Sequence, residues 1–274
     1  VPETENVILG VAPGIIDWKL PNDFLDKIKN LKGISTLSAW VHYIDLDYCK
    51  KRNIVVTNTP AANSQSVAEY AIWMMFSLAK KLPLQVSDGF KTKTDQNHKQ
   101  IEIVGKTMAV FGLGNIGSRI AKMGKGLGMN VIYWSPKTKS KDYQYKDFDD
   151  ALREADFIFN CVETYEGTKD LFDQDKLSQM RKTAYFISVL GGMGWGPEDN
   201  DYLVKAVNEG KLAGFAVEAE HEAKYKVPAI KRGANIFIPG GYAYFTHEAE
   251  KLSLQKWVEA ITGITKGNFK YRVI

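Results

Sequence analysis

Gly112, Gly114 and Gly117 have the spacing G-x-G-x-x-G, which is typical of a backbone that binds phosphate groups. The apolar run 108–111 predicts a buried strand before them, and a helical pattern follows through Met123. The first glycine permits a tight turn, the second lets the backbone approach a pyrophosphate, and the third lets the helix pack on the strand. The N-terminal amides of the helix would face the phosphates. The motif predicts dinucleotide binding, with a purely structural glycine turn as the alternative.

The composition is that of an ordinary globular protein, since 45% of the 274 residues are hydrophobic and 25% are charged. The net charge of +4 is small and the lysines are scattered, so we expect no nucleic-acid partner. The longest apolar stretch, 67–82, is too short and too interrupted by charge to cross a bilayer, so we expect no membrane partner. Cys49 and Cys161 belong to no CxxC or Cys/His pattern, which predicts no metal site and a cytoplasmic location.

Strand and helix patterns alternate along the chain, which predicts an α/β fold with a parallel sheet and helices on both of its faces. Ser66-x-x-Glu69 is a capping box and predicts a helix from Val67 to Lys81. That helix is apolar on nearly all sides, which is typical of a buried helix or of a subunit interface. Further strands are expected at 7–11, 34–37, 54–56, 108–111, 130–134, 157–161, 185–189, 214–217 and 236–238, and further helices at 21–30, 116–127, 148–154, 175–180, 200–209 and 246–264.

Four motifs in the same order resemble those of the D-isomer-specific 2-hydroxyacid dehydrogenases, and the resemblance covers nearly the whole chain. Residues 53–63 read NIVVTNTPAAN and resemble the family's connection between two domains. Residues 66–70 read SVAEY and resemble the start of its dimer-forming helix. Residues 104–117 read VGKTMAVFGLGNIG and are similar to its nucleotide motif, and residues 210–214 read GKLAG and are similar to the approach to a late strand.

The resemblance implies a Rossmann-type doubly wound parallel-sheet cofactor domain inserted in a smaller flavodoxin-like α/β substrate domain. On this basis residues 1–76 are the N-terminal part of the substrate domain, 77–250 the dinucleotide-binding domain, and 251–274 a helix that returns to the substrate domain. The family usually has some tens of residues more before Val7, so we expect the substrate domain to be truncated. The resemblance also implies a homodimer formed through the helix from Val67 to Lys81.

In this family an arginine binds the substrate, and a histidine adjusted by a glutamate donates a proton. Here Gly191 stands at the arginine position, in the sequence ISVLGG, and Gly240 at the histidine position, in IPGGY. The glutamate position falls on Ala223, or on Glu222 with a slip of one residue. Glycine provides neither charge nor proton, so the family's roles do not carry over to Gly191 or Gly240. We therefore expect a rebuilt active site.

Three nearby side chains are candidate replacements for the missing proton donor. Tyr242 and Tyr244 follow the histidine position closely, and a tyrosine can donate to a developing alkoxide. Their alternative role is as packed aromatic wall residues. His247 can relay a proton, or it can be a solvated side chain in the first turn of the last helix.

The expected substrate loop reads AWVHYID over residues 39–45, where the family has a pattern like AGVDxID. Trp40 replaces a glycine that lets backbone amides reach a carboxylate. Trp40, His42 and Tyr43 are candidates for substrate contact, because loops on a rigid scaffold often carry such residues. The alternative is that they pack within the loop.

The choice between NAD and NADP depends on the residue at the end of the second strand of the cofactor domain, because an acidic residue there binds the ribose of NAD. Ser135 is uncharged and Lys137 is close by, which favours NADP by charge. Glu218 replaces the aspartate that in this family meets the nicotinamide amide. The residues expected to contact NADP or NAD are Gly112, Gly114, Asn115, Ile116, Gly117, Ser135, Lys137, Leu190 and Glu218.

We therefore predict an NAD(P)-dependent oxidoreductase whose substrate is a small carbonyl or hydroxy compound. One alternative is a non-catalytic dinucleotide-binding sensor or assembly protein, because the glycine motif is intact while both catalytic side chains are missing. Another alternative is a structural homodimer with a vestigial site.

Overall fold

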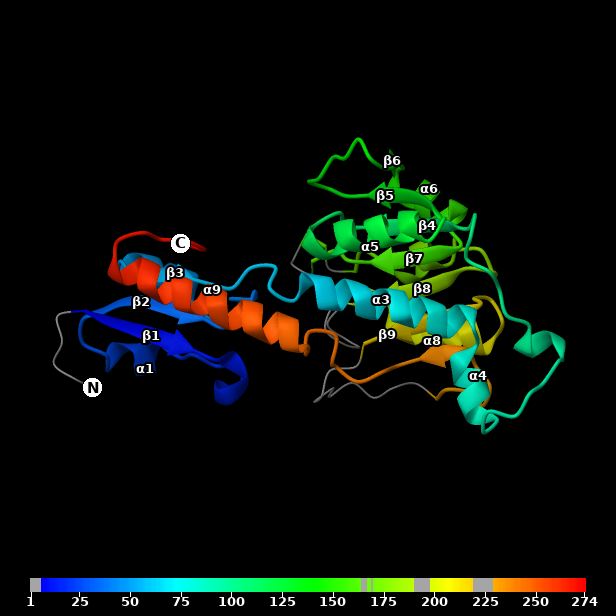
Figure 1. The fold of residues 1–274 in the computed structure, drawn as a ribbon, viewed down its shortest axis with the longest axis horizontal. Coiled ribbons are helices and arrows are strands. Elements are labelled where there is room, and N and C mark those ends of the chain that lie inside the picture. Colours follow the sequence, from blue (N-terminus) through cyan, green and yellow to red (C-terminus); the bar gives the residue numbers. More distant parts are fainter. Residues whose placement is uncertain (1–5, 164–166, 169, 190–197, 219–228) are drawn as a thin grey trace. The chain divides into compact units, whose positions relative to one another are not determined.

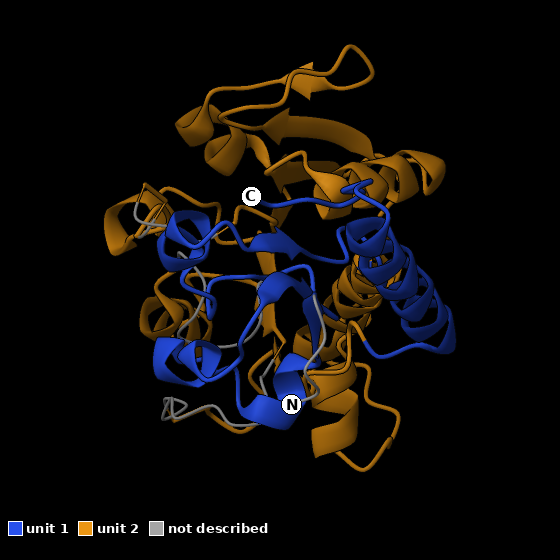
Figure 2. Ribbon diagram, turned by 90° about the vertical axis from the view of Figure 1, so that its left-hand side faces the viewer, with its two compact units in different colours: residues 1–63, 245–274 blue, residues 64–244 orange. Residues whose placement is uncertain are grey.

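The chain folds into two compact units, each with its own parallel sheet (Figure 2). The computed structural model describes residues 6–163, 167–168, 170–189, 198–218 and 229–274. The smaller unit combines Val1–Asn63 with Phe245–Ile274, and the larger unit is Ser64–Tyr244. The larger unit is therefore inserted within the smaller one in sequence, as predicted.

The boundaries between the units differ from the expected ones after residues 76 and 250. The helix α3, Ser64–Ala79, is continuous and packs along its whole length within the larger unit, so the first boundary precedes it. The second boundary lies between Tyr244 and Phe245, just before the last helix begins.

The smaller unit contains a three-stranded parallel sheet in the order β1-β2-β3 (Figure 1). Glycines on two strands allow the last helix to approach one face of this sheet. A Cβ atom at Gly10 would lie 2.9 Å from Trp257 Cζ2, and one at Gly33 would lie 2.9 Å from Ile264 Cγ2. Ile34 points to the opposite face, where it is fully buried with residues of the short helices α1 and α2. The elements are β1 (Val7–Val11), α1 (Asn22–Asp26), β2 (Leu31–Thr36), α2 (Leu46–Lys51), β3 (Val55–Thr57) and α9 (His247–Thr265).

The C-terminal residues pair with the outer edge of β3. The Val273 amide donates to the Val56 carbonyl at 2.7 Å, and the Asn58 amide donates to the Tyr271 carbonyl at 3.2 Å. An antiparallel bridge between Thr57 and Arg272 lies between these two bonds. The edge of this sheet is therefore covered by the chain's own terminus.

The larger unit contains a seven-stranded parallel sheet in the order β10-β9-β8-β7-β4-β5-β6. From β4 the chain proceeds outward to β5 and β6, and then crosses back to β7 on the other side of β4. The order reverses between β4 and β7, and ligands of such sheets bind at the carboxyl ends of the strands at this point. The strands are β4 (Thr107–Phe111), β5 (Asn130–Trp134), β6 (Gln144–Tyr145), β7 (Phe157–Asn160), β8 (Tyr185–Ser188), β9 (Gly214–Val217) and β10 (Ile236–Phe237).

Helices cover both faces of this sheet, and each face has its own hydrophobic core. Val110 is buried in the core beneath α3 and α5, while the next residue, Phe111, is buried in the core beneath α6, α7 and α8. This alternation is the period of two expected of a strand that is buried on both sides. Figure 1 shows α3 and α5 side by side on one face. The fold is a doubly wound α/β fold, as predicted; its further helices are α5 (Asn115–Gly126), α6 (Phe148–Glu154), α7 (Gln174–Leu177) and α8 (Asn200–Asn208).

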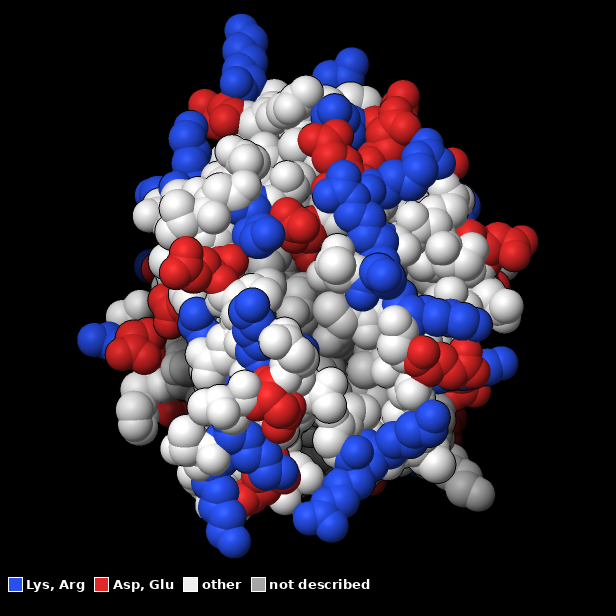
Figure 3. Space-filling view, turned by 90° about the vertical axis from the view of Figure 1, so that its right-hand side faces the viewer, with Lys and Arg blue, Asp and Glu red and all other residues white. Residues whose placement is uncertain are grey.

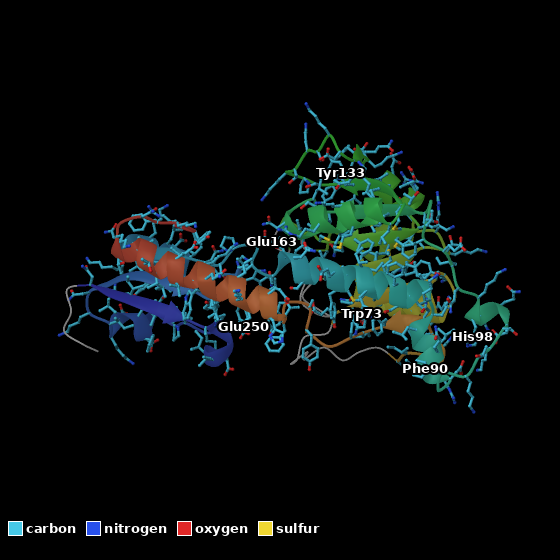
Figure 4. All side chains as sticks on the ribbon, in the orientation of Figure 1. Trp73, Phe90, His98, Tyr133, Glu163 and Glu250 are labelled. Atoms are coloured by element: carbon cyan, nitrogen blue, oxygen red, sulfur yellow. The ribbon has the colours of Figure 1, made fainter. Side chains whose placement is uncertain are left out.

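The apolar character of α3 is explained largely by contacts within its own unit. Met74, Met75 and Leu78 are fully buried in the core that α3 shares with α5 and the sheet. Asn235 Nδ2 donates to the Leu78 carbonyl at 3.2 Å, which ties the end of α3 to the start of β10. Trp73 is the large apolar residue of α3 that stays exposed, at 43% (Figure 4).

The predicted capping box at Ser66 is wrong. The helix begins two residues earlier, at Ser64, and Ser66 is a buried residue inside it. The Glu69 side chain accepts a hydrogen bond from Gln65 Nε2 at 2.7 Å, one helical turn away. Three short elements were not predicted from the sequence, namely α2, β6 and α4 (Leu82–Ser87). The helix α1 is shorter than the expected 21–30.

Candidate cofactor and active site

The turn after β4 has a backbone that requires glycine at its first position. Gly112 has φ +88°, a conformation that side-chain-bearing residues rarely adopt. A Cβ atom there would also lie 2.7 Å from the Cys161 carbonyl oxygen at the end of the neighbouring strand β7. The Gly112 amide donates to the Trp134 carbonyl at 2.8 Å, so the turn is held against the end of β5 as well.

The other two glycines of the motif have opposite surroundings. A Cβ atom at Gly117 would lie 2.0 Å from the Gly112 carbonyl oxygen, so this glycine is required for α5 to pack on the turn. Within the described part of the chain, a Cβ atom at Gly114 would meet nothing within 4 Å. The protein's own packing therefore does not require glycine at 114, and the space beside it is open to a ligand.

The N-terminus of α5 begins directly beside this open space. Gly114 occupies the N-cap position and has no side chain to satisfy the first amides, and the first turn (Asn115, Ile116, Gly117) is uncharged. Asn115 is exposed. Unpaired amides together with the positive end of the helix dipole bind anions. The residues present therefore fit the pyrophosphate of a dinucleotide.

The segment after β5 turns back on itself. The Thr138 amide donates to Ser135 Oγ at 3.2 Å, and the Ser140 amide donates to the Tyr133 hydroxyl at 2.8 Å. Tyr133 is almost fully buried (Figure 4), so the turn is anchored in the core. Lys137 is exposed. The predicted residues Ser135 and Lys137 thus lie on one anchored turn that carries positive charge.

Gly240, at the position of the missing histidine, lies among aromatic side chains. A Cβ atom at Gly240 would lie 2.7 Å from Tyr242 Cε2, so the Tyr242 ring occupies the space where a side chain at 240 would begin. The Gly240 carbonyl accepts hydrogen bonds from the Tyr70 hydroxyl at 2.7 Å and from the Tyr242 amide at 2.8 Å. Tyr242 is 53% exposed, so its ring is also accessible to a ligand.

Glu218 supports the same segment from the end of β9. Its side chain is buried, and Oε1 accepts a hydrogen bond from the Ala243 amide at 2.8 Å. The pKa of Tyr70 is raised, first by burial and then by the negative charge of Glu218 and by Tyr242. Tyr70, Glu218 and Tyr242 therefore form one cluster around Gly240, which we call the Gly240 cluster.

Sequence reasoning placed Glu218 and Tyr242 near the site but did not find Tyr70. The Tyr70–Gly240 hydrogen bond joins residues 170 positions apart. Tyr70 lies in the SVAEY segment, which was interpreted only as part of a dimer helix. Its half-buried position beside Trp73, with ring centroids 4.9 Å apart, is visible only in three dimensions.

The predicted substrate loop is held in place within the smaller unit. The Tyr43 hydroxyl is hydrogen-bonded to Thr36 Oγ1, and burial is the main cause that raises the pKa of Tyr43. Trp40 and His42 are exposed, with ring centroids 6.3 Å apart. Tyr43 thus anchors the loop, while Trp40 and His42 are presented outward.

The remaining predicted residues fall in other places. His247 is the exposed first residue of α9 and belongs to the smaller unit. Tyr244 is 58% exposed at the end of the larger unit. Leu190 and Gly191 lie outside the described residues, as do the candidate glutamate positions 222 and 223.

On the face shown in Figure 3, acidic and basic side chains are interspersed. Within the described residues, no three His, Cys, Asp or Glu side chains are grouped so that they could hold a metal ion. Of the helices described, none combines the length and hydropathy that a membrane span needs.

Comparison with known proteins identifies the larger unit. Residues 72–236 match the family model "D-isomer specific 2-hydroxyacid dehydrogenase, NAD binding domain". The chain belongs to the D-isomer-specific 2-hydroxyacid dehydrogenase family. Within this dehydrogenase family the protein is an oxidoreductase with a nicotinamide dinucleotide cofactor, as predicted.

Individual relatives and solved structures are similar to this chain over most of its length. A glyoxylate reductase of Thermococcus litoralis is 26% identical over 268 residues, which cover 92% of this chain and 80% of the relative. The structure of D-lactate dehydrogenase from Aquifex aeolicus, complexed with NAD and lactic acid, has a TM-score of 0.78 at 28% identity and covers 97% of this chain and 84% of that one. An acyclic imino acid reductase in complex with NADPH and D-Arg shares the fold, with a TM-score of 0.82 at 22% identity and coverage of 99% and 86%.

The two glycines with opposite surroundings generate a matched pair of substitutions. Gly117→Ala should lower the melting temperature, because overpacking against the Gly112 carbonyl costs about 1–3 kcal/mol. Gly114→Ala should lower the melting temperature of the protein alone much less, only through the loss of a glycine N-cap, and should weaken NADH binding roughly tenfold or more, because its methyl group enters the open space. Thermal unfolding with and without NADH measures both effects. Equal destabilisation by the two variants would contradict this assignment.

Proposed function

We propose that this protein is an NAD(P)-dependent oxidoreductase that acts on a small carbonyl or hydroxy compound with Tyr242 as the proton donor. The observation that carries the proposal is the Tyr242 ring over Gly240, 2.7 Å from the place of a Cβ atom. Gly240 has no side chain at the histidine position, and the Tyr242 side chain, which can donate a proton, occupies that space instead. The site is rebuilt around this tyrosine.

The chemistry divides between the cofactor and the chain. When bound, the reduced nicotinamide supplies a hydride to the carbonyl carbon. The Tyr242 hydroxyl then has the task of protonating the carbonyl oxygen as negative charge develops on it. Tyr70 and Glu218 hold the Gly240–Ala243 backbone in place through two hydrogen bonds of 2.7 and 2.8 Å. Because both are buried or half-buried, they keep this segment rigid beneath the reacting groups.

The substrate class follows from what the rebuilt site lacks and what its relatives use. Gly191 cannot pair with a carboxylate, so the substrate either lacks a carboxylate or carries one bound by other groups. We assign substrate contact to the exposed Trp40 and His42 rings, with Tyr43 holding their loop in shape. Since two relatives are named glyoxylate reductase and D-lactate dehydrogenase, small 2-oxo acids belong in the first test panel.

The direct test is turnover of the wild-type protein with NADPH or NADH against a panel of 2-oxo acids and uncharged carbonyl compounds. The proposal expects cofactor oxidation with at least one member of the panel. Binding of cofactor without turnover of any compound would contradict it, and would favour a non-catalytic dinucleotide-binding sensor or assembly protein.

Removal of the Tyr242 hydroxyl tests the proton donor. Tyr242→Phe should lower kcat by about 100-fold or more, because general acid catalysis typically contributes that much. The Kd for NADPH should stay unchanged, since the ring remains over Gly240. Tyr145→Phe, at an exposed position on β6, is the matched control and should keep full activity. Unaltered kcat in Tyr242→Phe would reject the role, and a loss in Tyr244→Phe instead would transfer it to Tyr244.

We propose that NADP is preferred over NAD, because Ser135 is uncharged and its turn carries the exposed Lys137. Ser135→Asp should reverse the preference, raising the Kd for NADPH about tenfold through repulsion of the 2′-phosphate and lowering the Kd for NADH. Fluorescence titration of both cofactors measures this. A Kd ratio that does not change would show that this turn does not select the cofactor.

We also propose a homodimer formed through α3. Trp73 is 43% exposed and packs at 4.9 Å, between ring centroids, against both Tyr70 and Phe237, which makes an apolar surface that a second copy can cover. Trp73→Glu should therefore shift the protein to monomer in analytical ultracentrifugation, while Tyr145→Glu should not. A wild-type protein that is monomeric at all concentrations would contradict the dimer.

We further propose a cytoplasmic location. Cys49 and Cys161 are both free thiols, which is usual in a reducing compartment.

A further inference from the structure

A buried carboxyl group lies at the carboxyl edge of the larger sheet, outside the Gly240 cluster. Glu198 is only 7% exposed, and Oε2 accepts a hydrogen bond from Asn160 Nδ2 at 2.7 Å. Asn160 is the last residue of β7, and its partner in the register of the sheet is Ser188, the last residue of β8. Glu198 is therefore held against the ends of two neighbouring strands.

Among the described residues, burial and not a neighbouring charge is the main influence on the pKa of Glu198. Burial raises the pKa of Glu198 to about 7, and hydrogen bonding from Ser188, from its own amide and from Asn160 opposes this shift. Among the described residues, Glu198 Oε1 and Ser188 Oγ have no partner of normal hydrogen-bond geometry. The acidic side chains on the adjoining helices, Asp173 and Asp199, cap α7 and α8 through backbone amides. No charged side chain of the described residues contributes to the raised pKa of Glu198.

A short series of contacts connects this carboxyl group to the dinucleotide turn. Asn160 Oδ1 accepts a hydrogen bond from the Val162 amide at 3.1 Å. The Val162 amide nitrogen and the Cys161 carbonyl oxygen are the atoms that a Cβ at Gly112 would meet, at 3.0 and 2.7 Å. The Cys161 amide in turn donates to the Phe111 carbonyl at 2.8 Å. The side-chain amide of Asn160 thus connects Glu198 to the backbone against which Gly112 packs.

The distance between the two sites is small enough for their charges to interact. β4, which ends at Phe111 directly before Gly112, is next to β7, and β7 is next to β8. Neighbouring strands lie about 4.8 Å apart, so the ends of β4 and β8 are about 10 Å apart. At separations of this order, a carboxylate that is buried, as Glu198 is, repels a pyrophosphate bound at the turn after β4.

We propose that Glu198 is a positioning residue that couples dinucleotide binding to the uptake of a proton, so that the cofactor binds most tightly when Glu198 is protonated. The inference rests on the cofactor binding of the proposed function and adds a regulation of it by pH. The bound pyrophosphate disfavours the carboxylate and favours the carboxylic acid. Protonation keeps the Asn160–Glu198 hydrogen bond, since Oε2 still accepts.

The sign of the pH dependence follows directly. Binding raises the pKa of Glu198 above its already raised value in the free protein, which is about 7. Protons are then taken up on binding between the two pKa values, and affinity falls as the pH rises through this window. Well below it, Glu198 is protonated in both states and affinity does not depend on pH.

The experiment is calorimetric titration of the whole protein with NADH in two buffers of different ionisation enthalpy, which counts the protons taken up. NADH is the probe because it lacks the 2′-phosphate of NADPH, which itself titrates near neutral pH. The wild-type protein should take up a fraction of a proton near pH 7. Its Kd should rise about tenfold between about pH 6 and pH 8.5.

Two variants and a control separate this coupling from a structural role. Glu198→Gln keeps an acceptor for Asn160 but cannot ionise, so it should bind NADH with no proton uptake and a flat pH profile. Ser188→Ala removes a group that lowers the pKa of Glu198, so it should move the midpoint of the profile to higher pH. Ser188→Ala therefore tests the coupling even if the Glu198→Gln variant does not fold. Glu102→Gln, at an exposed position, should behave like the wild type.

The outcomes distinguish failure of this inference from failure of the proposed function. NADH binding without proton uptake in the wild type overturns the inference and leaves the proposed function intact. Proton uptake that persists in Glu198→Gln also overturns it, as does a midpoint that Ser188→Ala leaves unmoved. Absence of NADH and NADPH binding at every pH would instead contradict the cofactor binding of the proposed function.

Discussion

The close approach between the backbone of Gly112 and the helix α5 is the constraint on which the larger unit depends. A side chain at Gly117 would overlap the Gly112 carbonyl, and one at Gly112 would overlap the end of β7. Because both side chains are missing, β4 ends, the chain turns and α5 begins within a few residues. The result is a helix N-terminus with unsatisfied amides beside open space at Gly114. The same packing brings the end of β7 against the turn, which is how the Asn160–Glu198 pair comes to be connected to the backbone beside Gly112.

Glycine has a different consequence at position 240 of the larger unit. At Gly240 the missing side chain leaves room that a ring two residues later occupies, and the Tyr70 hydroxyl and the Glu218 carboxylate fix the backbone around it. The glycines of the turn therefore shape the end of β4 and the start of α5, while Gly240 changes which side chain occupies its position. A family can keep its cofactor domain under such changes, because the packing that builds the phosphate turn is independent of the proton donor.

Elements with a strong local pattern could be predicted from the sequence. The strands β1, β5 and β9 and the helix α6 have the expected bounds, and β4 and α5 differ by a residue, because apolar periodicity and the glycine motif both act within a few residues. The short α2, α4 and β6 carry too few residues to show a period. Residues 66–69 have the sequence of a capping box, but the helix already begins at Ser64. The Glu69 side chain instead accepts a hydrogen bond from Gln65. Tyr70 and the Asn160–Glu198 pair could not be found in this way, because their hydrogen bonds join residues 170 and 38 positions apart.

We propose that this member of the dehydrogenase family transfers hydride without the arginine and histidine at their usual positions. The most direct measurement is the transfer of deuterium from reduced cofactor that carries deuterium at both C4 positions to the former carbonyl carbon of the product, followed by mass spectrometry across the panel of carbonyl compounds. The account predicts a singly labelled alcohol formed in equal amount to the oxidised cofactor. Cofactor that binds but passes no label to any compound would contradict it.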